Sequence, residues 1–526
     1  MLKKEDTKVL GIEFGSTRIK AVLIDNTFKE LASGSFEWEN QLVDGFWTYR
    51  LEDIWIGLQT AYKKLADEYK NIRNEPLTEI DAIGFSGMMH GYLPFNEKGD
   101  LLVPFRTWRN TTTEEAARRL SEWFSFNIPQ RWSIAHLYQA ILNEEDHIKE
   151  IDYFTTLAGY IHWQLTGKKV LGIGEAAGMF PIDSEIGDYN QTMVELFDQK
   201  TAHIEKDWSL LDILPSVLTA GEEAGKLTKE GALLLDPSGQ LKPGSLLCPP
   251  EGDAGTGMVA TNSVAERTGN VSAGTSIFSM VVLEEELNDY YTEIDMVTTP
   301  TGKPTAMVHC NNFTTDINNW ASLFKEVVHS LGYEVSADEL FTMLFNKALE
   351  ADDDGGKLIS SNYYSGEPIT GFEEGRPLFV QMPDSNLSLA NFMQTQIYSA
   401  LATLKIGMDI LTKKENVTVE QILGHGGFFR TKDVGQQMMA DALRIPVAVM
   451  DSAGEGGPWG MALLASYLVN KEVDESLEEF IDHKVFKEEV AYRIDPTERG
   501  INKFEEFLKR YKDMLYVEKA AVEHIN

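Results

Sequence analysis

A turn of small residues between two strand-forming runs occurs twice in this chain, and this repetition restricts the possible folds. After each copy come a helix-forming segment and a buried-strand pattern. The first series comprises residues 11–25, 50–69 and 80–89, and the second comprises residues 268–284, 316–332 and 420–427. The halves share the order of these elements but not their residue identities. We therefore predict two α/β domains of similar plan, each a mixed sheet covered by helices.

The length of the chain also requires more than one domain, because 526 residues exceed what one hydrophobic core organises. Residues 220–252 are rich in turn formers and include Pro237, Pro243, Pro249 and Pro250. Such a stretch is typical of the approach to a domain boundary. We expect an N-terminal domain over residues 1–264 and a C-terminal domain over residues 265–526.

Charge and cysteine content exclude several classes of partner and site. The net charge is −35, with 82 acidic against 47 basic residues. This balance argues against nucleic acid or an anionic membrane as partner, and an anionic substrate would need local help from backbone N–H groups, a metal or a few bases. The two cysteines, Cys248 and Cys310, form no CxxC pair. We expect neither a disulfide framework nor a zinc site.

The apolar runs of the sequence are short. The longest, MALLASYLV at residues 461–469, falls well below the ~20 residues of a membrane-spanning helix. The opening MLKKEDTKVLGIEFG has no apolar stretch of signal-peptide length. We therefore expect a cytoplasmic protein.

The two small-residue turns, EFGST at residues 13–17 and SAGTS at residues 272–276, favour phosphate binding. Backbone N–H groups in such turns can surround an anion, and two turns that face each other could hold one polyphosphate. Either turn alone is also explained as an ordinary hairpin turn, so the pair is more informative than one member. No GxxxxGK[ST] pattern occurs, which excludes a P-loop.

Three further segments carry residues with functional chemistry. Asp253, in PPEGDAGTGMVAT, is either a helix N-cap or a general base for a substrate hydroxyl, and the two roles are compatible. His90, in SGMMHG, could bind a polyol or be a core-edge histidine held by a backbone carbonyl. Trp108, Arg109 and Asn110 form a plausible sugar-binding set, although Trp108 is equally explained as core.

Glycines at the end of a predicted strand suggest a nucleotide contact. Gly426 and Gly427, in GHGGFFRTKDVGQQMMADALRIPV, would let a flat base and a ribose approach the backbone. Met438 and Met439, in the helix that follows, are better explained as core packing.

Taken together, these motifs resemble the FGGY family of carbohydrate kinases, within the actin-like, ribonuclease-H-like ATPase group. GIEFGSTRIKAVLID resembles the first phosphate segment, TGNVSAGTS the second, and GHGGFFRTKDVGQQMMADAL with GEGGPWGMALLA the adenosine segments. EGDAGTG is similar to the segment that carries the catalytic aspartate. The motifs cover essentially the whole chain in family order. The resemblance implies a two-domain actin-like fold with a cleft between a sugar-binding and a nucleotide-binding domain.

The resemblance also implies roles for individual residues in the transfer of a phosphoryl group from ATP, with Mg²⁺, to a sugar hydroxyl. Asp253 would be the general base, and Glu13 would stand at the metal position where the family usually has aspartate. The nucleotide would contact Gly15, Ser16, Thr17, Lys20, Gly274, Thr275, Gly426 and Gly427, and the sugar Met89, His90, Trp108, Asn110 and Asp253.

The identity of the sugar stays open between two classes. SGMMHG is close to the xylulokinase form and also similar to gluconokinases, while Asn110 stands where xylulokinases commonly carry an acid. We expect a ketopentose such as xylulose, with a sugar acid served by Arg109, or another polyol or ketose, as the alternatives. The rival classes are a non-kinase actin-like ATPase and a sugar-binding regulator without catalysis. A homodimer is an option that the sequence does not decide.

Overall fold

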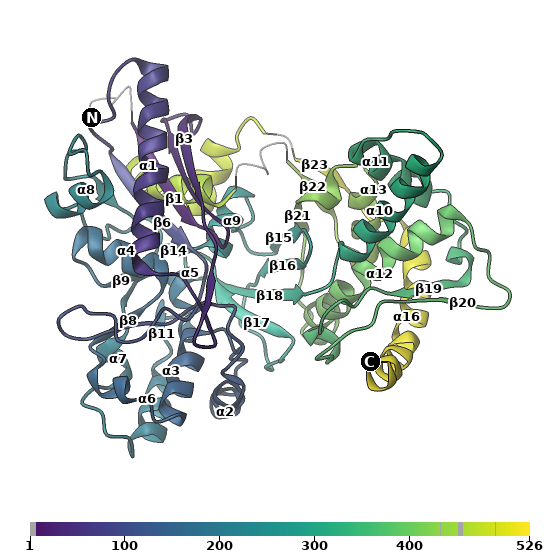
Figure 1. The fold of residues 1–526 in the computed structure, drawn as a ribbon, viewed down its shortest axis with the longest axis horizontal. Coiled ribbons are helices and arrows are strands. Elements are labelled where there is room, and N and C mark those ends of the chain that lie inside the picture. The colour runs from purple at the N-terminus through teal and green to yellow at the C-terminus, as the bar shows by residue number, and fades with distance from the viewer. Residues whose placement is uncertain (1–6, 432, 451–455, 490, 526) are drawn as a thin grey trace. The chain divides into compact units, whose positions relative to one another are not determined.

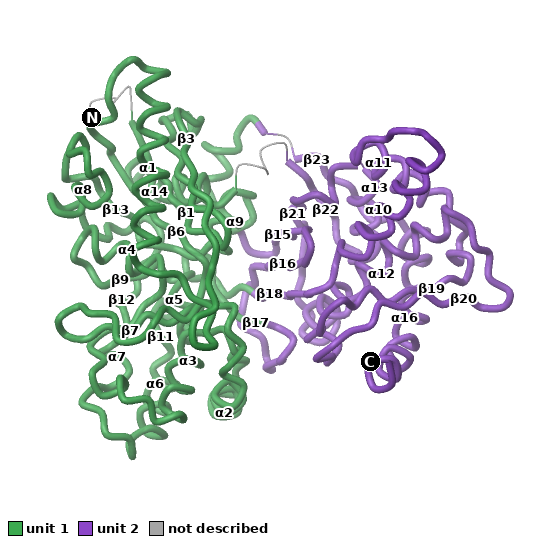
Figure 2. The backbone as a smooth tube through the Cα atoms, viewed as in Figure 1, with its two compact units in different colours: residues 1–264, 295–305, 455–488 green, residues 265–294, 306–454, 489–526 purple. Residues whose placement is uncertain are grey.

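The chain divides into two compact units, shown in different colours in Figure 2. The structure is a computed structural model and describes residues 7–431, 433–450, 456–489 and 491–525. Unit 1 comprises residues 1–264, 295–305 and 455–488, and unit 2 comprises residues 265–294, 306–454 and 489–526. Each unit is built around one large mixed sheet (Figure 1).

The sheet of unit 1 begins with the antiparallel meander that the sequence predicts. β1 (Val9–Phe14) pairs with β2 (Arg18–Ile24), and β2 pairs with β3 (Glu30–Glu37). On its other side β1 pairs in parallel with β6 (Ala82–Gly87), which pairs in parallel with β13 (Leu246–Leu247) and β14 (Glu251–Gly252). The register aligns Glu13, Ser86 and Glu251. The carboxyl ends of three strands therefore meet at one edge of this sheet.

Helices cover both faces of the sheet of unit 1, and glycines allow the closest approaches. α1 (Leu51–Arg73) packs on β3 at Gly34, where a Cβ would lie 2.1 Å from the carbonyl oxygen of Ala61. On the opposite face, α14 (Gly457–Asn470) packs on β1 at Gly11, where a Cβ would lie 2.1 Å from the carbonyl oxygen of Pro458. The sheet is thus the middle layer of unit 1, with the odd-numbered side chains of β1 facing α14.

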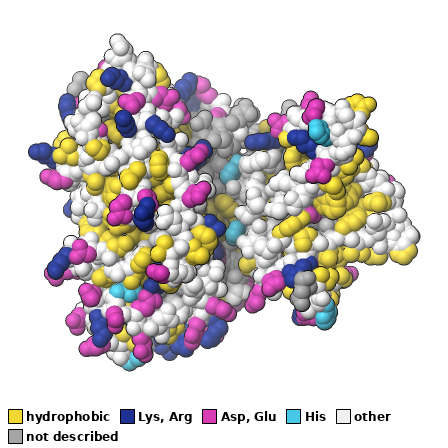
Figure 3. Space-filling view, in the orientation of Figure 1, with side chains coloured by type: hydrophobic (Ala, Val, Ile, Leu, Met, Phe, Trp, Pro, Cys, Tyr) yellow, Lys and Arg dark blue, Asp and Glu magenta, His cyan; other side chains and the backbone are white. Residues whose placement is uncertain are grey.

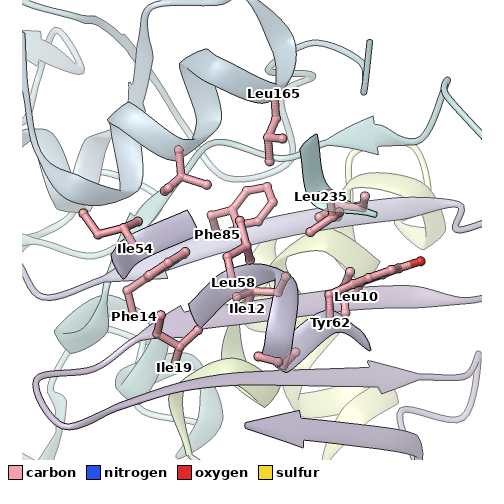
Figure 4. Close-up of a cluster of buried hydrophobic side chains, with 14 of the residues drawn as sticks. Leu10, Ile12, Phe14, Ile19, Ile54, Leu58, Tyr62, Phe85, Leu165 and Leu235 are labelled. Carbon is pink, nitrogen blue, oxygen red and sulfur yellow. The ribbon is translucent and has the colours of Figure 1, made fainter. Parts of the chain in front are cut away.

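The predicted apolar face of α1 forms the core against the even-numbered residues of β1 (Figure 4). The predicted positions Ile54, Leu58, Ala61, Leu65 and Tyr69 are all buried. Because each large apolar side chain contributes about 1.5–3 kcal/mol when fully buried, this layer stabilises the strands that carry the site. The labelled members of the cluster are Leu10, Ile12, Phe14, Ile19, Ile54, Leu58, Tyr62, Phe85, Leu165 and Leu235.

The other elements of unit 1 are helices and short strand pairs. The helices are α2 (Glu114–Phe124), α3 (Ser133–Leu142), α4 (Leu157–Thr166), α5 (Ile173–Ala176), α6 (Gln191–Thr201), α7 (Leu210–Ile213), α8 (Lys229–Leu235), α9 (Asp253–Ala260) and α15 (Leu477–Phe480). The strand pairs are β4 (Gln41–Val43) with β5 (Phe46–Thr48), β7 (Leu93–Phe95) with β8 (Tyr153–Thr155), β9 (Val170–Gly172) with β12 (Ser216–Leu218), and β10 (Ile182–Asp183) with β11 (Asp188–Tyr189). Gly167 ends α4 in the left-handed conformation with φ 73°.

Unit 2 repeats the strand plan of unit 1, as predicted. β15 (Thr268–Ala273) pairs antiparallel with β16 (Ile277–Val282) and parallel with β21 (Gln421–His425), which pairs in parallel with β22 (Val447–Val449). The predicted turn SAGTS, at residues 272–276, was wrong in extent. Ser272 and Ala273 belong to β15, and only residues 274–276 make the turn, because β15 pairs with β16 on one side and with β21 on the other.

The seven-stranded sheet is completed by β17 (Ile294–Thr298), β18 (Pro304–Cys310) and β23 (Tyr492–Ile494), in the order β17-β18-β16-β15-β21-β22-β23. Residues 295–305, which include most of β17 and the start of β18, are counted with unit 1. The helices of unit 2 are α10 (Thr315–Ser330), α11 (Ala337–Ala348), α12 (Leu389–Asp409), α13 (Val434–Leu443) and α16 (Glu498–His524), and β19 (Leu358–Ser361) pairs with β20 (Leu378–Gln381). α16 is amphipathic and buries one face, which includes Phe504, Phe507, Leu508 and Tyr511.

Short 3₁₀ and π turns complete the two units. The 3₁₀ turns are Asp146–Glu150, Gly355–Lys357, Pro368–Thr370 and Gly427–Phe429, and the π turns are Ile410–Lys414 and Ile481–Val485.

On the face of unit 1 drawn in Figure 3, acidic and basic side chains are interspersed. No helix in the described part of the chain is both long enough and apolar enough to cross a membrane.

Candidate active site

Asp253 lies where β14 ends and α9 begins, at the edge of the sheet where three parallel strands finish. It is the first residue of α9, and the N-cap position belongs to Gly252, so the N-cap alternative for Asp253 was wrong by one residue. Burial raises the pKa of Asp253 to about 6, while the backbone N–H groups of Met89 and Ala254 bond to the carboxylate and oppose the rise. A carboxylate with this pKa is ionised near neutral pH and can still accept a proton.

Glu13 is the second carboxyl group at this edge. It stands near the end of β1 and faces the beginning of α14, where a Cβ on Gly457 would lie 2.0 Å from Glu13 Oε1. Burial, followed by the negative charge of Asp253, raises the pKa of Glu13 to about 7, and Lys20 opposes this rise. The Lys20 Nζ lies 3.9 Å from Glu13 Oε2. Glu13 and Asp253 are therefore electrostatically coupled, and protonation of one affects the other.

The turn between β1 and β2 directs its carbonyl groups into the protein. Trp38 Nε1 donates to the carbonyl oxygen of Gly15 at 2.7 Å, and Tyr49 Oη donates to that of Ser16 at 2.6 Å. The Trp38 backbone N–H donates to the carbonyl oxygen of Thr17 at 3.1 Å. Among the described residues, none accepts a hydrogen bond from the N–H or hydroxyl groups of Ser16 and Thr17. Several donors of this turn are therefore available to an anion.

The turn between β15 and β16, in unit 2, has the same arrangement. Thr314 Oγ1 donates to the carbonyl oxygen of Gly274 at 2.7 Å, and the Phe313 N–H donates to that of Thr275 at 3.1 Å. Thr275 is exposed, and within the described ranges its N–H and hydroxyl groups have no acceptor. Both predicted phosphate turns thus present donors outward.

The glycines after β21 lie close to this second turn. Gly426 has φ 107°, and a Cβ there would lie 2.4 Å from the carbonyl oxygen of Ala273. Gly427 has open space around its Cβ position. Position 426 therefore accepts only glycine, whereas the backbone at Gly427 is open to an approaching group, which is compatible with the predicted nucleotide contact. The companion stretch GEGGPWGMALLA lies partly outside the described residues, because 451–455 are not described.

His90 has both ring nitrogens engaged. Its Nδ1 lies 2.9 Å from the carbonyl oxygen of Gly178, and Arg131 Nε donates to its Nε2 at 3.3 Å. These partners assign the proton to Nδ1. Burial, followed by the positive charge of Arg131, lowers the pKa of His90 to about 3, so the ring is neutral. The contact with a backbone carbonyl is the one that the core-edge alternative describes.

Met89 connects this loop to Asp253. Besides its backbone N–H contact with the Asp253 carboxylate, its side chain fills the space beside Gly252, where a Cβ would lie 2.4 Å from Met89 Cγ. The SGMMHG loop and Asp253 are therefore neighbours within unit 1, as the predicted sugar site requires.

The three residues of the Trp108–Asn110 segment differ in exposure and in their contacts. Trp108 is 39% exposed, which argues against the core alternative for this residue. Arg109 is exposed and stacks its guanidinium over Trp47 at 4.6 Å. Asn110 is buried, and its amide donates to the carbonyl oxygens of Trp47 and Thr107 and accepts from the Trp47 N–H. These hydrogen bonds hold the Asn110 amide against the backbone. The contact of Asn110 with a sugar stays a prediction.

Sequence reasoning missed four charged side chains around this site: Arg131, Glu175, Glu251 and Asp295. Glu251 and Glu175 are fully buried, and the Glu175 N–H donates to Glu251 Oε2 at 3.0 Å. Burial raises the pKa of Glu251 to about 8 and that of Glu175 well above its usual range. The one local signal was the position of Glu251 two residues before Asp253. Apart from that signal, an acidic residue in the sequence is expected to be exposed, so the burial of these acids could not be predicted.

Models of a known family match most of the chain. The N-terminal domain of the FGGY family of carbohydrate kinases matches residues 8–236, and the C-terminal domain matches residues 269–469. This chain belongs to the FGGY family of carbohydrate kinases. The first phosphate turn and the SGMMHG loop lie in the N-terminal match, and the second turn and Gly426 lie in the C-terminal match. Asp253 falls between the two, so its role rests on its surroundings.

Individual relatives agree with this family assignment. A xylulose kinase from Staphylococcus xylosus is 21% identical over 87% of this chain and 90% of its own length. A ligand-bound xylulose kinase from Lactobacillus acidophilus superposes with TM-score 0.78 at 18% identity, over 97% of this chain and 98% of its own. A gluconate kinase from Lactobacillus acidophilus gives the same TM-score and coverage. These structures show that the FGGY kinase has the two-domain actin-like ATPase fold.

Membership in the family also settles the class of reaction. The FGGY kinase is a phosphotransferase with an alcohol group as acceptor, and the family implies a small-molecule sugar and ATP as its substrates. This assignment decides against the non-kinase ATPase alternative.

Proposed function

We propose that this FGGY kinase transfers the γ-phosphoryl group of ATP to a hydroxyl group of a ketopentose such as xylulose. The observation that carries the proposal is the position of Asp253. Its carboxylate stands at the strand edge, contacts the SGMMHG loop through Met89, and has a pKa of about 6. The similarity to xylulose kinases supports the choice of sugar.

In this proposal Asp253 acts as general base. The sugar hydroxyl donates its proton to the Asp253 carboxylate as its oxygen attacks phosphorus, and the bond from phosphorus to the bridging oxygen of ADP breaks. A positioned base of this kind contributes ~10²–10⁴-fold to the rate. Most of the remaining acceleration in phosphoryl transfer comes from positioning and charge stabilisation.

The donors for the phosphate groups come from the two turns. The outward N–H and hydroxyl groups of Ser16, Thr17 and Thr275 would bind phosphate oxygens, with Lys20 adding a positive charge. The domain roles follow from these positions: the first 264 residues would bind the sugar, and the later part of the chain the adenosine, through Gly426 and Gly427.

Mg²⁺ fits this arrangement as an ion held mainly by the nucleotide. No cluster of three or more potential metal-ligating side chains occurs among the residues that the structure describes. Mg²⁺ typically keeps several waters and binds through one or two carboxylates together with substrate phosphates. Glu13 would be the carboxylate, and the ion would offset negative charge on the phosphates.

The test is a coupled assay of ADP formation over ketopentoses, ketohexoses, polyols and aldonic acids, with phosphorylated product identified by mass spectrometry. We expect the highest kcat/KM with a ketopentose. ADP formation that no sugar increases would refute the kinase proposal, and a preference for gluconate would replace the ketopentose by the sugar acid. Sugar binding without product would identify the regulator alternative.

A further inference from the structure

An arginine–aspartate pair lies beside the SGMMHG loop and has no part in the chemistry described above. Arg131 Nη2 donates to Asp295 Oδ2, while Arg131 Nε donates to His90 Nε2 at 3.3 Å. Asn127 Nδ2 donates to Asp295 Oδ1 at 2.9 Å. The pair is therefore fixed at both ends by neutral groups.

Both members of the pair belong to unit 1, although they are far apart in the sequence. Arg131 precedes α3, and Asp295 begins the segment of residues 295–305 that is part of unit 1. Two bonds hold that segment in place: Thr298 Oγ1 donates to the carbonyl oxygen of Ile173 at 3.1 Å, and the Ala220 N–H donates to that of Pro300 at 2.8 Å. Asp295 itself lies on β17, the edge strand of the seven-stranded sheet, and these two bonds anchor the segment that follows it within unit 1.

The loop residues His90 and Met89 connect the pair to Asp253. His90, which receives the Arg131 hydrogen bond, directly follows Met89, whose backbone N–H contacts the Asp253 carboxylate. A Cβ on Gly178 would lie 2.9 Å from both His90 Nδ1 and Met89 Cε, so these two side chains pack against the same wall. A sugar whose reactive hydroxyl lies at Asp253 would extend along this loop.

Arg131 retains hydrogen-bonding capacity toward such a sugar. A guanidinium has five N–H donors, and its bonds to His90 and Asp295 use two of them. The Arg131 side chain is 26% exposed and that of Asp295 11%. The pair therefore offers donors and acceptors together, the combination that a vicinal diol matches.

The charge of the pair decides which sugars it suits. Asp295 neutralises Arg131, His90 is neutral, and the carboxylates of Glu13 and Asp253 add negative charge nearby. A sugar acid would place its carboxylate in this field without an uncompensated cation to meet it, and burying an unpaired charge is costly.

We propose that the Arg131–Asp295 pair binds hydroxyl groups of the acceptor and selects neutral sugars over sugar acids. This inference rests on the proposed kinase function and makes it narrower. The sequence offers Arg109 as the arginine that would bind the carboxylate of a sugar acid. In this proposal Arg131 is the arginine that contacts the acceptor, and it binds hydroxyl groups.

The decisive experiment compares xylulose and gluconate as acceptors in wild-type protein and in Asp295→Asn. The substitution keeps the shape of the side chain but leaves the charge of Arg131 uncompensated. We expect the ratio of kcat/KM for gluconate to that for xylulose to rise by about tenfold or more, as one charge-assisted hydrogen bond can supply. A ratio that moves by less than about twofold, in a variant with the wild-type melting temperature, would overturn the proposal.

Arg131→Lys keeps the ion pair and tests the binding role if Asp295→Asn does not fold. Lysine lacks the planar fork of arginine, so we expect KM for xylulose to rise about tenfold with little change in kcat. An unchanged KM would contradict the proposal. Glu122→Gln is the matched control, because it breaks an exposed arginine–carboxylate pair on α2, with Arg118, away from the loop. Its kinetics should equal those of the wild type.

Binding measurements separate this inference from the kinase proposal. If wild-type protein phosphorylates no sugar, calorimetric titration with xylulose and with gluconate, without nucleotide, still tests the pair. Tighter binding of xylulose that is reversed in Asp295→Asn would support the selectivity, and tighter binding of gluconate to the wild type would refute it.

Discussion

Replacing Asp253 with asparagine tests the proposed general base while the shape of the site is kept. The amide oxygen can still accept the Met89 N–H, so α9 and the SGMMHG loop should remain in place. What disappears is the capacity to take the proton of the sugar hydroxyl. The loss of this negative charge also lowers the pKa of Glu13, because Asp253 is one of the causes that raise it.

The expected loss follows from the role and the pKa of the group. A positioned base contributes ~10²–10⁴-fold, which corresponds to about 2.7–5.4 kcal/mol of activation free energy. With a pKa of about 6, Asp253 is about 90% ionised at pH 7 and about 10% ionised at pH 5. The wild-type kcat/KM should therefore fall as the pH drops through about 6, and the asparagine variant should lose this dependence.

The assay is coupled ADP formation with xylulose from about pH 5 to 8, with sugar binding followed by calorimetry. Asp212→Asn is the control, because Asp212 is an exposed aspartate in the first turn of α7. A kcat for Asp253→Asn within about tenfold of the wild type would refute the assignment. Weaker sugar binding with an unchanged kcat would also refute it, because Asp253 would then act in binding alone.

Three further substitutions test the structure around the site. Glu251→Gln should flatten the pH dependence of the free energy of unfolding. The folded-state pKa of Glu251, about 8, lies above its unfolded value, so the stability that protonated Glu251 contributes is complete below about pH 4.5 and is lost, by about 1.4 kcal/mol per pH unit, as the pH rises through about 8. Calorimetric melting of both proteins across this range checks this, and parallel curves would contradict it. Gly426→Ala should lower the melting temperature, because φ 107° and the contact with Ala273 add about 1–3 kcal/mol of strain; an unchanged transition would contradict it. Leu58→Ala should cost about 2–5 kcal/mol in denaturant unfolding, whereas Ile56→Ala, on the exposed face of α1, should change it by less than about 0.5 kcal/mol, and equal effects would reject the assigned faces.

The features that local sequence determines were predictable at the level of elements. The strand-forming runs in residues 9–24 predicted β1 and β2, and the helix-forming pattern of residues 50–69 predicted α1. The error in the extent of the SAGTS turn has the same origin. Glycine and serine mark turns locally, but pairing on both sides of β15 overrides their preference in the middle of a sheet.

The site itself was only partly predictable. Asp253 and the SGMMHG loop stood out because each follows a buried strand, and strands that pair in parallel bring such ends to one edge. Arg131 and Asp295 gave no local signal, because they are 164 positions apart in the sequence. The engagement of Asn110 by Trp47 has the same cause.

The sequence alone determined the order of strands and helices, the two small-residue turns and the candidate base, because backbone preference and periodicity act over a few residues. Only the tertiary structure decided which charges are compensated, which ring nitrogen of His90 carries the proton and which carboxyl groups are desolvated. Those properties depend on distances between side chains that the chain brings together from separate segments, and electrostatic interactions are set by such distances and by burial.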